Sequence, residues 1–363
     1  MTVGIPHHGG ATWAVLQWVL GLRRLGHDVL LVEPVDEPSE DQLAYFGSMV
    51  HGFGLAGAAA LLTSGRRAVG LAFEDVVGFV DGADLLVNLA GTLRDPELVE
   101  RPPVRAYLDL DPAFTQLWQE VEGIDMGFGH HTHFVTVGLN VGRPGCRVPT
   151  CDRRWIPAPP PVVLEQWPAA EPLRAPWTTV ASWRGYGPVV HDGVHHGQKA
   201  HSWRSLLALP GQVPVEVLPA LGIDGGDEKD VAALHEHGWR WVDPLMVTGT
   251  ADDYRSFVRA SGGELGVAKS GYVVSGCGWF SDRSACYLAS GRPVVAQETG
   301  WSEHLPSGPG LLKFSTVEEA AEAVCLVAAD QAAHSRAARA VAEEHLDSDR
   351  VLGRILQATG ESP

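Results

Sequence analysis

The amino-acid sequence predicts an α/β protein of two domains, each built on a doubly wound parallel sheet. Three observations lead to this prediction. Short apolar strands alternate with amphipathic helices along the chain, which is the pattern of βαβ units and a parallel sheet. The length of 363 residues suits two domains of roughly 150–200 residues each. A proline-rich run near the middle separates two such series of strands and helices.

The first series begins near the N-terminus. Gly9 and Gly10 follow a short apolar run and precede residues whose apolar side chains recur at helical spacing, and Gly26 ends that helix. A strand, a glycine turn, a helix and a second strand make one βαβ unit with a right-handed crossover. The expected elements are strand 3–6, helix 11–25 and strands 29–32, 84–89 and 104–108.

The boundary between the domains is expected at the run Ile156–Val163, whose four prolines exclude a central strand or a helix. The second series has strands 177–181, 215–218, 266–267 and 293–296, and helices 251–260, 281–290, 320–328 and 333–344. We therefore divide the chain into residues 1–160, 161–335 and 336–363. The last segment is expected to be a helix that packs back toward the first domain.

Composition excludes several classes of function. The net charge of −17 argues against a nucleic-acid partner, because phosphate contacts need a basic face. No stretch approaches the roughly 20 apolar residues of a membrane span, and the first residues lack the basic and apolar order of a signal peptide. We therefore expect a cytoplasmic protein and leave a homodimer open. The five cysteines follow no pattern, which predicts free thiols and no disulfide framework.

Polar side chains gather most densely in residues 264–300. Lys269 follows an apolar strand, and Ser281 and Asp282 are good N-cap residues for a helix with Arg283 in its first turn. The amino end of a helix with Lys and Arg beside it favours a diphosphate. Ordinary caps and turns explain the glycines and Ser281, but they do not explain cations and carboxylates at the ends of successive strands. We therefore expect a functional site here.

The first domain offers candidates for proton transfer. His7 and His8 follow the first strand, where open α/β sheets place their ligands, and the pKa of a free histidine lies near neutrality. Asp109 ends a later strand and could orient the imidazole of His8. Asp109 and Asp111 together form a D-x-D pattern that could instead bind Mg²⁺ or serve only the loop. Pro112 ends the strand at once, which argues against the metal.

Two further patterns are less specific. Gly9 and Gly10 either let a ligand approach the backbone or form a tight turn, and they lack the G-x-G-x-x-G order of a dinucleotide site. The histidines at 130, 131 and 133 precede Cys146 and Cys151, but the spacing is not that of a zinc site. We expect His131 to lie in the cleft between the domains.

Residues 264–324 resemble the nucleotide-binding half of the GT-B glycosyltransferases. Ala289 to Val295 (ASGRPVV) is similar to the A-x-G-x-P-V-V strand of that family, which follows a glycine-rich loop and a helix. Gly310 to Leu312 and Thr316 to Ala320 resemble the end of the same half. Gly9-Gly10 and the segment 22–29 (LRRLGHDV) resemble the opening of the N-terminal half. The order of these motifs is similar to that in a group of bacterial glycosyltransferases.

The resemblance implies GT-B architecture, with two Rossmann-like domains facing a cleft. It places the nucleotide-sugar donor in residues 161–335 and the acceptor in residues 1–160, with no obligatory metal or other cofactor. The glutamate pair of retaining members is absent, since Gly278 and Cys286 stand in its place. Their basic pair corresponds to Arg184 and Lys199 at a longer spacing. Inverting members use a histidine oriented by an aspartate, a layout that His8 and Asp109 fit. Inversion is therefore favoured and retention stays open.

Together these inferences predict a metal-independent glycosyltransferase that moves a sugar from a nucleotide-diphosphate sugar to a hydroxyl of a small-molecule acceptor. His8 and Asp109 are the expected catalytic residues, and His7, Asp111 and His131 are expected to bind the acceptor. The expected donor-binding residues are Gly9, Gly10, Arg184, Lys199, Lys269, Gly271, Trp279, Phe280, Ser281, Asp282, Arg283, Ser284, Glu298, Thr299 and Gly300. A non-catalytic nucleotide- or sugar-binding protein of the same fold and a sugar-nucleotide epimerase are the alternatives.

Overall fold

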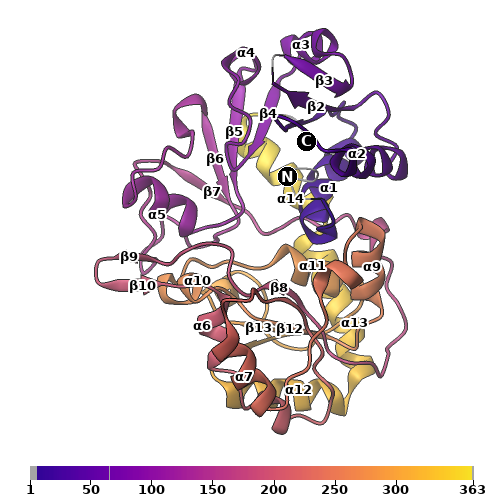
Figure 1. Cartoon of the computed structure of the whole chain (residues 1–363), viewed down its shortest axis with the longest axis vertical. Helices are drawn as coiled ribbons and strands as arrows, with labels where there is room; N and C mark the ends of the chain where they lie inside the picture. The colour runs from indigo at the N-terminus through magenta and orange to yellow at the C-terminus, as the bar shows by residue number, and fades with distance from the viewer. Residues whose placement is uncertain (1–5, 65, 362–363) are drawn as a thin grey trace.

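The computed structural model describes residues 6–64 and 66–361 and shows two α/β halves, one above the other in Figure 1. The N-terminal half is indigo to magenta and the C-terminal half is mostly orange. The strand expected over 3–6 lies, apart from Pro6, outside the described residues.

The N-terminal half contains two sheets. Its elements are α1 (Gly9–Arg24), β1 (Leu31–Pro34), α2 (Glu40–Gly52), β2 (Ala59–Thr63), β3 (Arg67–Gly70), α3 (Phe73–Asp81), β4 (Leu85–Leu89), α4 (Pro96–Val99), β5 (Val104–Asp109), α5 (Phe114–Glu120), β6 (His133–Thr136) and β7 (Trp155–Pro157). One sheet has the order β1-β2-β3, with β1 parallel and β3 antiparallel to β2. The other has the order β4-β5-β6-β7 and is parallel throughout, so that the carboxyl ends of its strands share one edge.

The C-terminal half is built on parallel strands. Its elements are β8 (Val180–Ser182), β9 (Val189–His191), β10 (Val194–His196), α6 (Lys199–Arg204), β11 (Ala220–Gly222), α7 (Glu228–Glu236), α8 (Pro244–Val247), α9 (Ala251–Arg259), β12 (Glu264–Gly266), α10 (Ser270–Ser275), α11 (Asp282–Ala289), β13 (Val294–Gln297), β14 (Leu311–Phe314), α12 (Val317–Ala329), α13 (Gln331–Val341) and α14 (Ser348–Thr359). Among the strand pairs in the described residues of this half, β9-β10 is the antiparallel one.

The strand order of this half creates a topological switch point. β11 pairs with β8, and β12, β13 and β14 follow one another in a second ladder. A parallel bridge between Thr178 and Glu264 places the two ladders side by side. The chain therefore runs outward from β8 in one direction to β11 and in the other direction to β12. Doubly wound sheets bind ligands beyond the carboxyl ends of the strands at such a point.

Most expected elements are confirmed, with shifted ends. α1, β4, β5, α9, α11, β13, α12 and α13 lie where the sequence predicts them. The strand expected over 215–218 is wrong by several residues: Val217 forms only a single bridge, to Trp177, and the ladder begins after Pro219, at Ala220. The proline-rich run starts with the edge strand β7, which agrees with its exclusion from the centre of a sheet.

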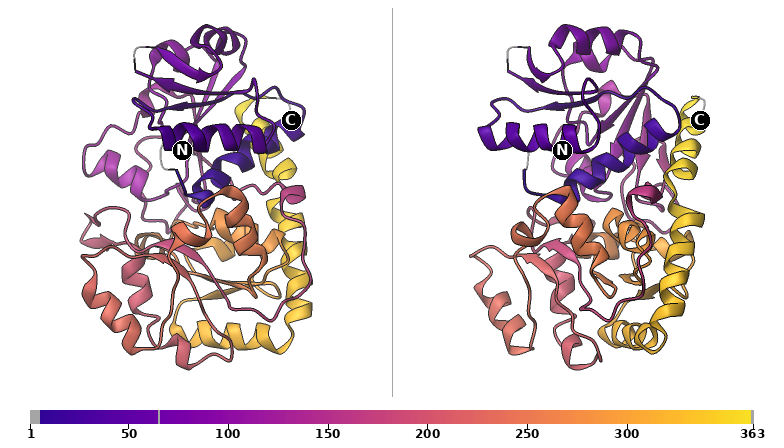
Figure 2. Two further views of the ribbon diagram at one scale, coloured as in Figure 1. Left: turned by 45° about the vertical axis from the view of Figure 1, so that its right-hand side comes forward. Right: turned by 90° about the vertical axis from the view of Figure 1, so that its right-hand side faces the viewer.

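The two halves share part of one hydrophobic core. Trp13 and Leu16 of α1 belong to the same buried cluster as Tyr254 of α9 and Leu288 of α11. α14 lies against α1, where Arg24 pairs with Asp349 at 2.8 Å. Figure 2 shows the yellow C-terminal helices running from the lower half up along the other half.

The boundaries predicted at 160 and 335 stay predictions. No described helix combines the length and the hydropathy that a membrane crossing requires.

Candidate functional site: the cleft between the halves

Three cations meet beyond the carboxyl ends of β8 and β12. Lys199 begins α6, Lys269 follows β12 and Arg283 lies in the first turn of α11. Within residues 6–64 and 66–361, the ammonium of Lys199 has no hydrogen-bonding or ion-pairing partner. Burial, together with the nearby charges of Arg283 and Lys269, lowers the pKa of Lys199 to about 7. A buried ammonium without a partner and close to two other cations would be stabilised by a bound anion.

Polar atoms without partners surround this cluster. Ser281 is only 4% exposed, and its buried hydroxyl has no partner among the described residues and caps no backbone N–H group, although Ser281 precedes α11. The Nε2 atom of Gln198 and the Nη2 atom of Arg283 are also buried and unpaired among the described residues. Buried polar groups are normally hydrogen-bonded, so several unpaired ones at one place indicate a missing ligand or water. The first-turn N–H groups of α11 favour negative charge at the same place.

Arg283 also has a structural role, because its contacts hold elements of the C-terminal half together. Its guanidinium is paired with Glu264, which is 0% exposed, and Nη1 donates to the carbonyl of Val180 at 3.0 Å. Of the three guanidinium nitrogens, Nη2 alone has no partner among the described residues and could bind a ligand. The sequence prediction of a donor-binding Arg283 therefore applies to one nitrogen atom, while the other two hold β8, β12 and α11 together.

Lys269 contacts the N-terminal half across the cleft. Its Nζ atom donates to the two carboxylate oxygens of Asp111 at 2.9 and 2.8 Å. The hydroxyl of Tyr186 donates to Asp111 at 2.5 Å, and that of Tyr272 donates to the same carboxylate. The ammonium also lies over the rings of Phe114, Tyr186 and Tyr272, at 5.1, 4.4 and 5.2 Å from their centres. Asp111 therefore faces the C-terminal half.

Asp109, by contrast, is enclosed in its own half. It is 0% exposed and accepts hydrogen bonds from Thr115, Gln116 and Thr136 at 2.7, 2.8 and 2.7 Å and from the N–H of Asp111 at 2.9 Å. Burial raises its pKa, and the hydrogen bonds oppose that effect. His8 is exposed at the start of α1. The prediction that Asp109 orients His8 is wrong, because four donors from its own half already occupy the carboxylate.

The glycine pair serves close packing between the halves. The N–H of Gly9 donates to the carbonyl of Thr248 at 3.0 Å, and a Cβ atom at Gly9 would lie 2.1 Å from the carbonyl oxygen of Thr250. At Gly10 a Cβ atom would lie 2.9 Å from the ring of Tyr254. In this arrangement the N–H of Gly9 is used within the protein, which argues against the expected ligand contact.

Two other expected site residues, His7 and Arg184, have partners elsewhere. His7 forms an exposed pair with Asp41 at 2.9 Å. Arg184 is held by Asp227 at 2.8 Å and Asp230 at 3.4 Å, so its charge is already compensated.

His131 donates through Nδ1 to the carbonyl of Gly127, accepts at Nε2 from the side-chain amide of Asn88 and packs against the ring of Tyr107. Burial lowers the pKa of His131. The prediction that His131 lies in the cleft is wrong, because its partners Gly127, Asn88 and Tyr107 all belong to the N-terminal half and His131 precedes the amino end of β6, away from the carboxyl edge of the sheet.

The segment 276–300 contacts the N-terminal half through Asn140, which sequence reasoning missed. Asn140 donates to the carbonyls of Gly276 and Gly300 at 3.2 and 3.4 Å and pairs with His304 at 2.6 Å. A bridge between Gly138 and Trp279 extends this contact. Asn140 lies just beyond the carboxyl end of β6. The expectation that ligands bind at the carboxyl ends of parallel strands, which singled out Asp109, therefore also applies to Asn140.

The remaining expected donor residues surround this contact or the start of α11. The hydroxyl of Thr299 donates to the carbonyl of Trp279 at 2.7 Å, and the carboxylate of Glu298 accepts from the N–H of Gly300 at 2.6 Å. Gly271 approaches the ring of Phe114, so α10 also reaches the N-terminal half. Phe280, Asp282 and Ser284 line small cavities beside α11.

The cleft is closed in this structure. The cavity between the halves has a volume of about 120 Å³ and is lined by Gln17, Leu110, Trp279 and Asp282, among others. Ligand pockets usually measure roughly 300–1,000 Å³. A cavity of this volume could hold a larger ligand only if the two halves moved apart, the reverse of the domain closure that ligands commonly induce.

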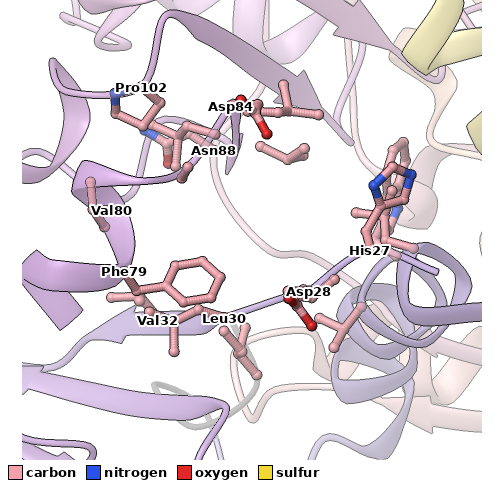
Figure 3. Close-up of a pocket in the computed structure, with 18 of the residues that line it drawn as sticks. His27, Asp28, Leu30, Val32, Phe79, Val80, Asp84, Asn88 and Pro102 are labelled. Carbon is pink, nitrogen blue, oxygen red and sulfur yellow. The ribbon is translucent and has the colours of Figure 1, made fainter. Parts of the chain in front are cut away.

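A larger cavity lies within the N-terminal half. It measures about 840 Å³ and separates the facing edges of β1 and β4, which do not pair with each other in the described residues. Figure 3 shows Phe79 and Val80 on one side and Asp84 and Asn88 on another. Its lining is mostly apolar and contains none of the three cations of the cleft. It is therefore not suited to a diphosphate.

The chain has the fold of glycosyltransferases of known structure. An α-glucosyltransferase solved with UDP-glucose and DNA containing an abasic site is 11% identical, with a TM-score of 0.57 over 98% of this chain and 97% of that chain. HepE of Anabaena, solved with UDP and glucose, is 12% identical, with a TM-score of 0.56 over 98% and 97%. AviGT4, a glycosyltransferase involved in avilamycin A biosynthesis, is 13% identical, with a TM-score of 0.53 over 99% and 92%. The predicted GT-B architecture is confirmed.

At these identities the likeness concerns the fold. No protein-family model and no curated protein sequence matches the chain.

Proposed function

We propose that this protein is a glycosyltransferase that moves a sugar from a nucleotide-diphosphate sugar to a hydroxyl of a small-molecule acceptor. The observation that carries the proposal is Lys199, whose ammonium has no partner among the described residues and lies at the switch point of the C-terminal sheet. It lies with Arg283 and the unpaired hydroxyl of Ser281 at the amino end of α11. Fold relatives that bind UDP or UDP-glucose support the choice of a nucleotide sugar. The net charge of −17 favours a small acceptor over nucleic acid.

The chemistry follows from the charges at this site. Departure of a nucleoside diphosphate builds negative charge on its terminal phosphate. Fixed cations and N–H groups, directed at that phosphate before the reaction starts, stabilise the charge as it forms. Lys199, at the start of α6, and the amino end of α11 would supply these charges and N–H groups. A carboxylate or imidazole of the N-terminal half then has to accept only the proton of the acceptor hydroxyl.

Calorimetry with UDP, GDP, dTDP and ADP, followed by an assay of donor hydrolysis, tests this function. A glycosyltransferase should bind one of the four nucleotides and slowly hydrolyse the matching sugar nucleotide when no acceptor is present. Binding without hydrolysis would instead indicate a non-catalytic binding protein. Interconversion of the donor sugar without loss of the nucleotide would indicate an epimerase. Absence of binding by all four nucleotides would contradict the proposed function.

Proton uptake provides a prediction specific to Lys199. Its pKa is about 7 in the free protein. A bound diphosphate favours the charged form, so the pKa rises on binding. At pH 6 the ammonium is charged in both states, whereas at pH 8 it is largely neutral only in the free protein. Binding should therefore take up close to one proton near pH 8 and little near pH 6, and affinity should fall as the pH rises above about 7.

The measurement is calorimetry in two buffers with different ionisation enthalpies. Lys199→Arg serves as the control, because arginine keeps the positive charge but does not titrate in this range. Its nucleotide binding should lose most of the proton uptake. Equal uptake in Lys199→Arg and in the wild type would assign the proton to another group.

Metal independence is a separate prediction. In the part of the chain that the structure describes, no three His, Cys, Asp or Glu side chains are grouped to hold a metal ion. The charge of Asp111 is already compensated by Lys269, and the oxygens of Asp109 already accept hydrogen bonds from neutral donors. We expect EDTA to leave donor hydrolysis unchanged. Loss of hydrolysis in EDTA and its recovery with Mn²⁺ would contradict this and return Asp109 and Asp111 to consideration as metal ligands.

A further inference from the structure

Asp111 is the carboxylate of the N-terminal half that faces the donor side of the cleft. It lies two residues beyond β5, at the edge where the carboxyl ends of the parallel strands meet. The three side chains that donate to it, Lys269, Tyr186 and Tyr272, all belong to the C-terminal half. Its side chain is 27% exposed, whereas Asp109 is wholly enclosed. Of the two carboxylates, only Asp111 can meet a substrate placed between the halves.

Lys269 connects this carboxylate to the cation cluster. Its ammonium is paired with Asp111, and its charge is close enough to Lys199 to help lower the pKa of that residue. A diphosphate bound at Lys199 would therefore also attract Lys269. The ammonium of Lys269 cannot remain centred between the two oxygens of Asp111, at 2.8 and 2.9 Å, and fully serve a second anion. The carboxylate and the diphosphate compete for one cation.

We propose that Asp111 is the catalytic base of the transfer and that Lys269 is its displaceable counterion. This inference rests on the proposed function. While Lys269 is paired with Asp111, its ammonium donates to both carboxylate oxygens and keeps them from the hydroxyl of an acceptor. A donor that draws Lys269 to its diphosphate leaves Asp111 with the two tyrosine hydroxyls alone. The base thus becomes effective only after the donor is in place.

The step balances with Asp111 as the proton acceptor. The acceptor hydroxyl oxygen forms a bond to the anomeric carbon of the sugar as the bond from that carbon to the phosphate oxygen breaks. The electron pair of the broken bond leaves with the nucleoside diphosphate, where Lys199 and Lys269 stabilise it. The hydroxyl proton passes to Asp111, which becomes a neutral carboxyl group. This direct displacement inverts the configuration of the sugar.

Two variants test the competition. Asp111→Asn removes the counter-charge and frees Lys269, so it should tighten binding of the preferred nucleoside diphosphate by about tenfold. It should lower donor hydrolysis by about 10²-fold or more, because the base is lost. A carboxylate with a merely structural role would not tighten binding on removal. Asp125→Asn is the matched control, since Asp125 is exposed and pairs with Arg94 at 3.2 Å in the same half. It should change neither property.

The background Lys269→Met separates competition from simple repulsion between Asp111 and the diphosphate. In that background Asp111→Asn should change nucleotide affinity by less than about twofold, because no shared cation remains. A tenfold tightening that persists there would overturn the proposal, and so would near-normal hydrolysis by Asp111→Asn.

If Asp111→Asn does not fold, Asp111→Glu replaces it. That variant keeps the charge but moves the carboxylate, so it should hydrolyse the donor at least about tenfold more slowly with nearly unchanged nucleotide affinity. Unchanged hydrolysis would contradict the assignment.

These outcomes are distinguishable from failure of the proposed function. If the wild type binds none of the four nucleotides, the proposed function fails before any variant is made. If the wild type binds and hydrolyses a donor but Asp111→Asn behaves like the wild type, only the role of Asp111 fails. His8, exposed at the start of α1, then becomes the next candidate for the base.

Discussion

Lys199→Met is expected to weaken binding of the preferred nucleoside diphosphate by roughly 10- to 100-fold, the loss of one charge-assisted contact of ~1.5–3 kcal/mol. The methionine keeps most of the aliphatic length of the lysine and removes only the ammonium. That ammonium has no partner among the described residues, and burial already disfavours its charged form. Unlike Lys269, it gives up no protein contact when the diphosphate arrives.

The same variant should be at least as resistant to thermal unfolding as the wild type. An unpaired ammonium in a partly buried place costs stability, and its removal relieves that cost. Binding and stability should thus change in opposite directions, which excludes misfolding as the cause of weaker binding. Lys229→Ala, on the exposed surface of α7, is the control and should alter neither property. A Lys199→Met protein that binds nucleotide normally would remove Lys199 from the site and with it the main support for the proposed function.

Arg283→Met is expected to have the largest effect on folding, a loss of about 3–5 kcal/mol in the free energy of unfolding. Glu264 is 0% exposed, and the guanidinium of Arg283 is its cationic partner. Replacing the arginine leaves a buried carboxylate without its counter-charge and also removes the hydrogen bond to Val180. Because domains of this kind are stable by only about 5–15 kcal/mol, the loss is large.

Denaturant unfolding with two companion variants measures this effect. Arg240→Met removes one partner of an exposed pair with Glu216, whose side chains are 75% and 45% exposed, and should cost at most about 1 kcal/mol. The double variant Arg283→Met, Glu264→Gln should recover much of the loss, because no buried charge remains uncompensated. If Arg283→Met costs no more than Arg240→Met, then the buried pair contributes little to the stability of the C-terminal half.

The sequence predicted the C-terminal site better than the N-terminal one, for a physical reason. Lys269, Ser281 and Arg283 lie close together in the chain, and successive parallel strands bring their carboxyl ends to one edge. Their gathering therefore follows from strand order alone. Lys199 comes from an earlier βα connection of the same sheet and joins them by the same rule.

The N-terminal predictions depended on which way a side chain turns after its strand. Asp109 and Asp111 are two residues apart, and both could be placed at the sheet edge from the sequence. Asp109 turns inward to Thr115, Gln116 and Thr136, while Asp111 turns outward to Lys269. Hydrogen-bond donors supplied by α5 and β6 decide between these directions. Thr115 and Gln116 lie in the adjoining segment and Thr136 on a neighbouring strand, but the sequence does not show that the carboxylate of Asp109 turns toward them.

The sequence by itself determined the α/β class, the two series of strands and helices, and the cation-rich switch point. These features follow from the alternation of apolar strands with amphipathic helices and from the parallel direction of the strands, which are local and repetitive properties. Only the tertiary structure decided which charges remain unpaired. Lys199 has no partner in the part of the chain that the structure describes, whereas the charge of Arg184 is compensated by Asp227 and that of Lys269 by Asp111. These pairings join segments separated by tens to more than a hundred residues in the chain. They follow from how the two halves close on one another, and that closure depends on packing along the whole interface.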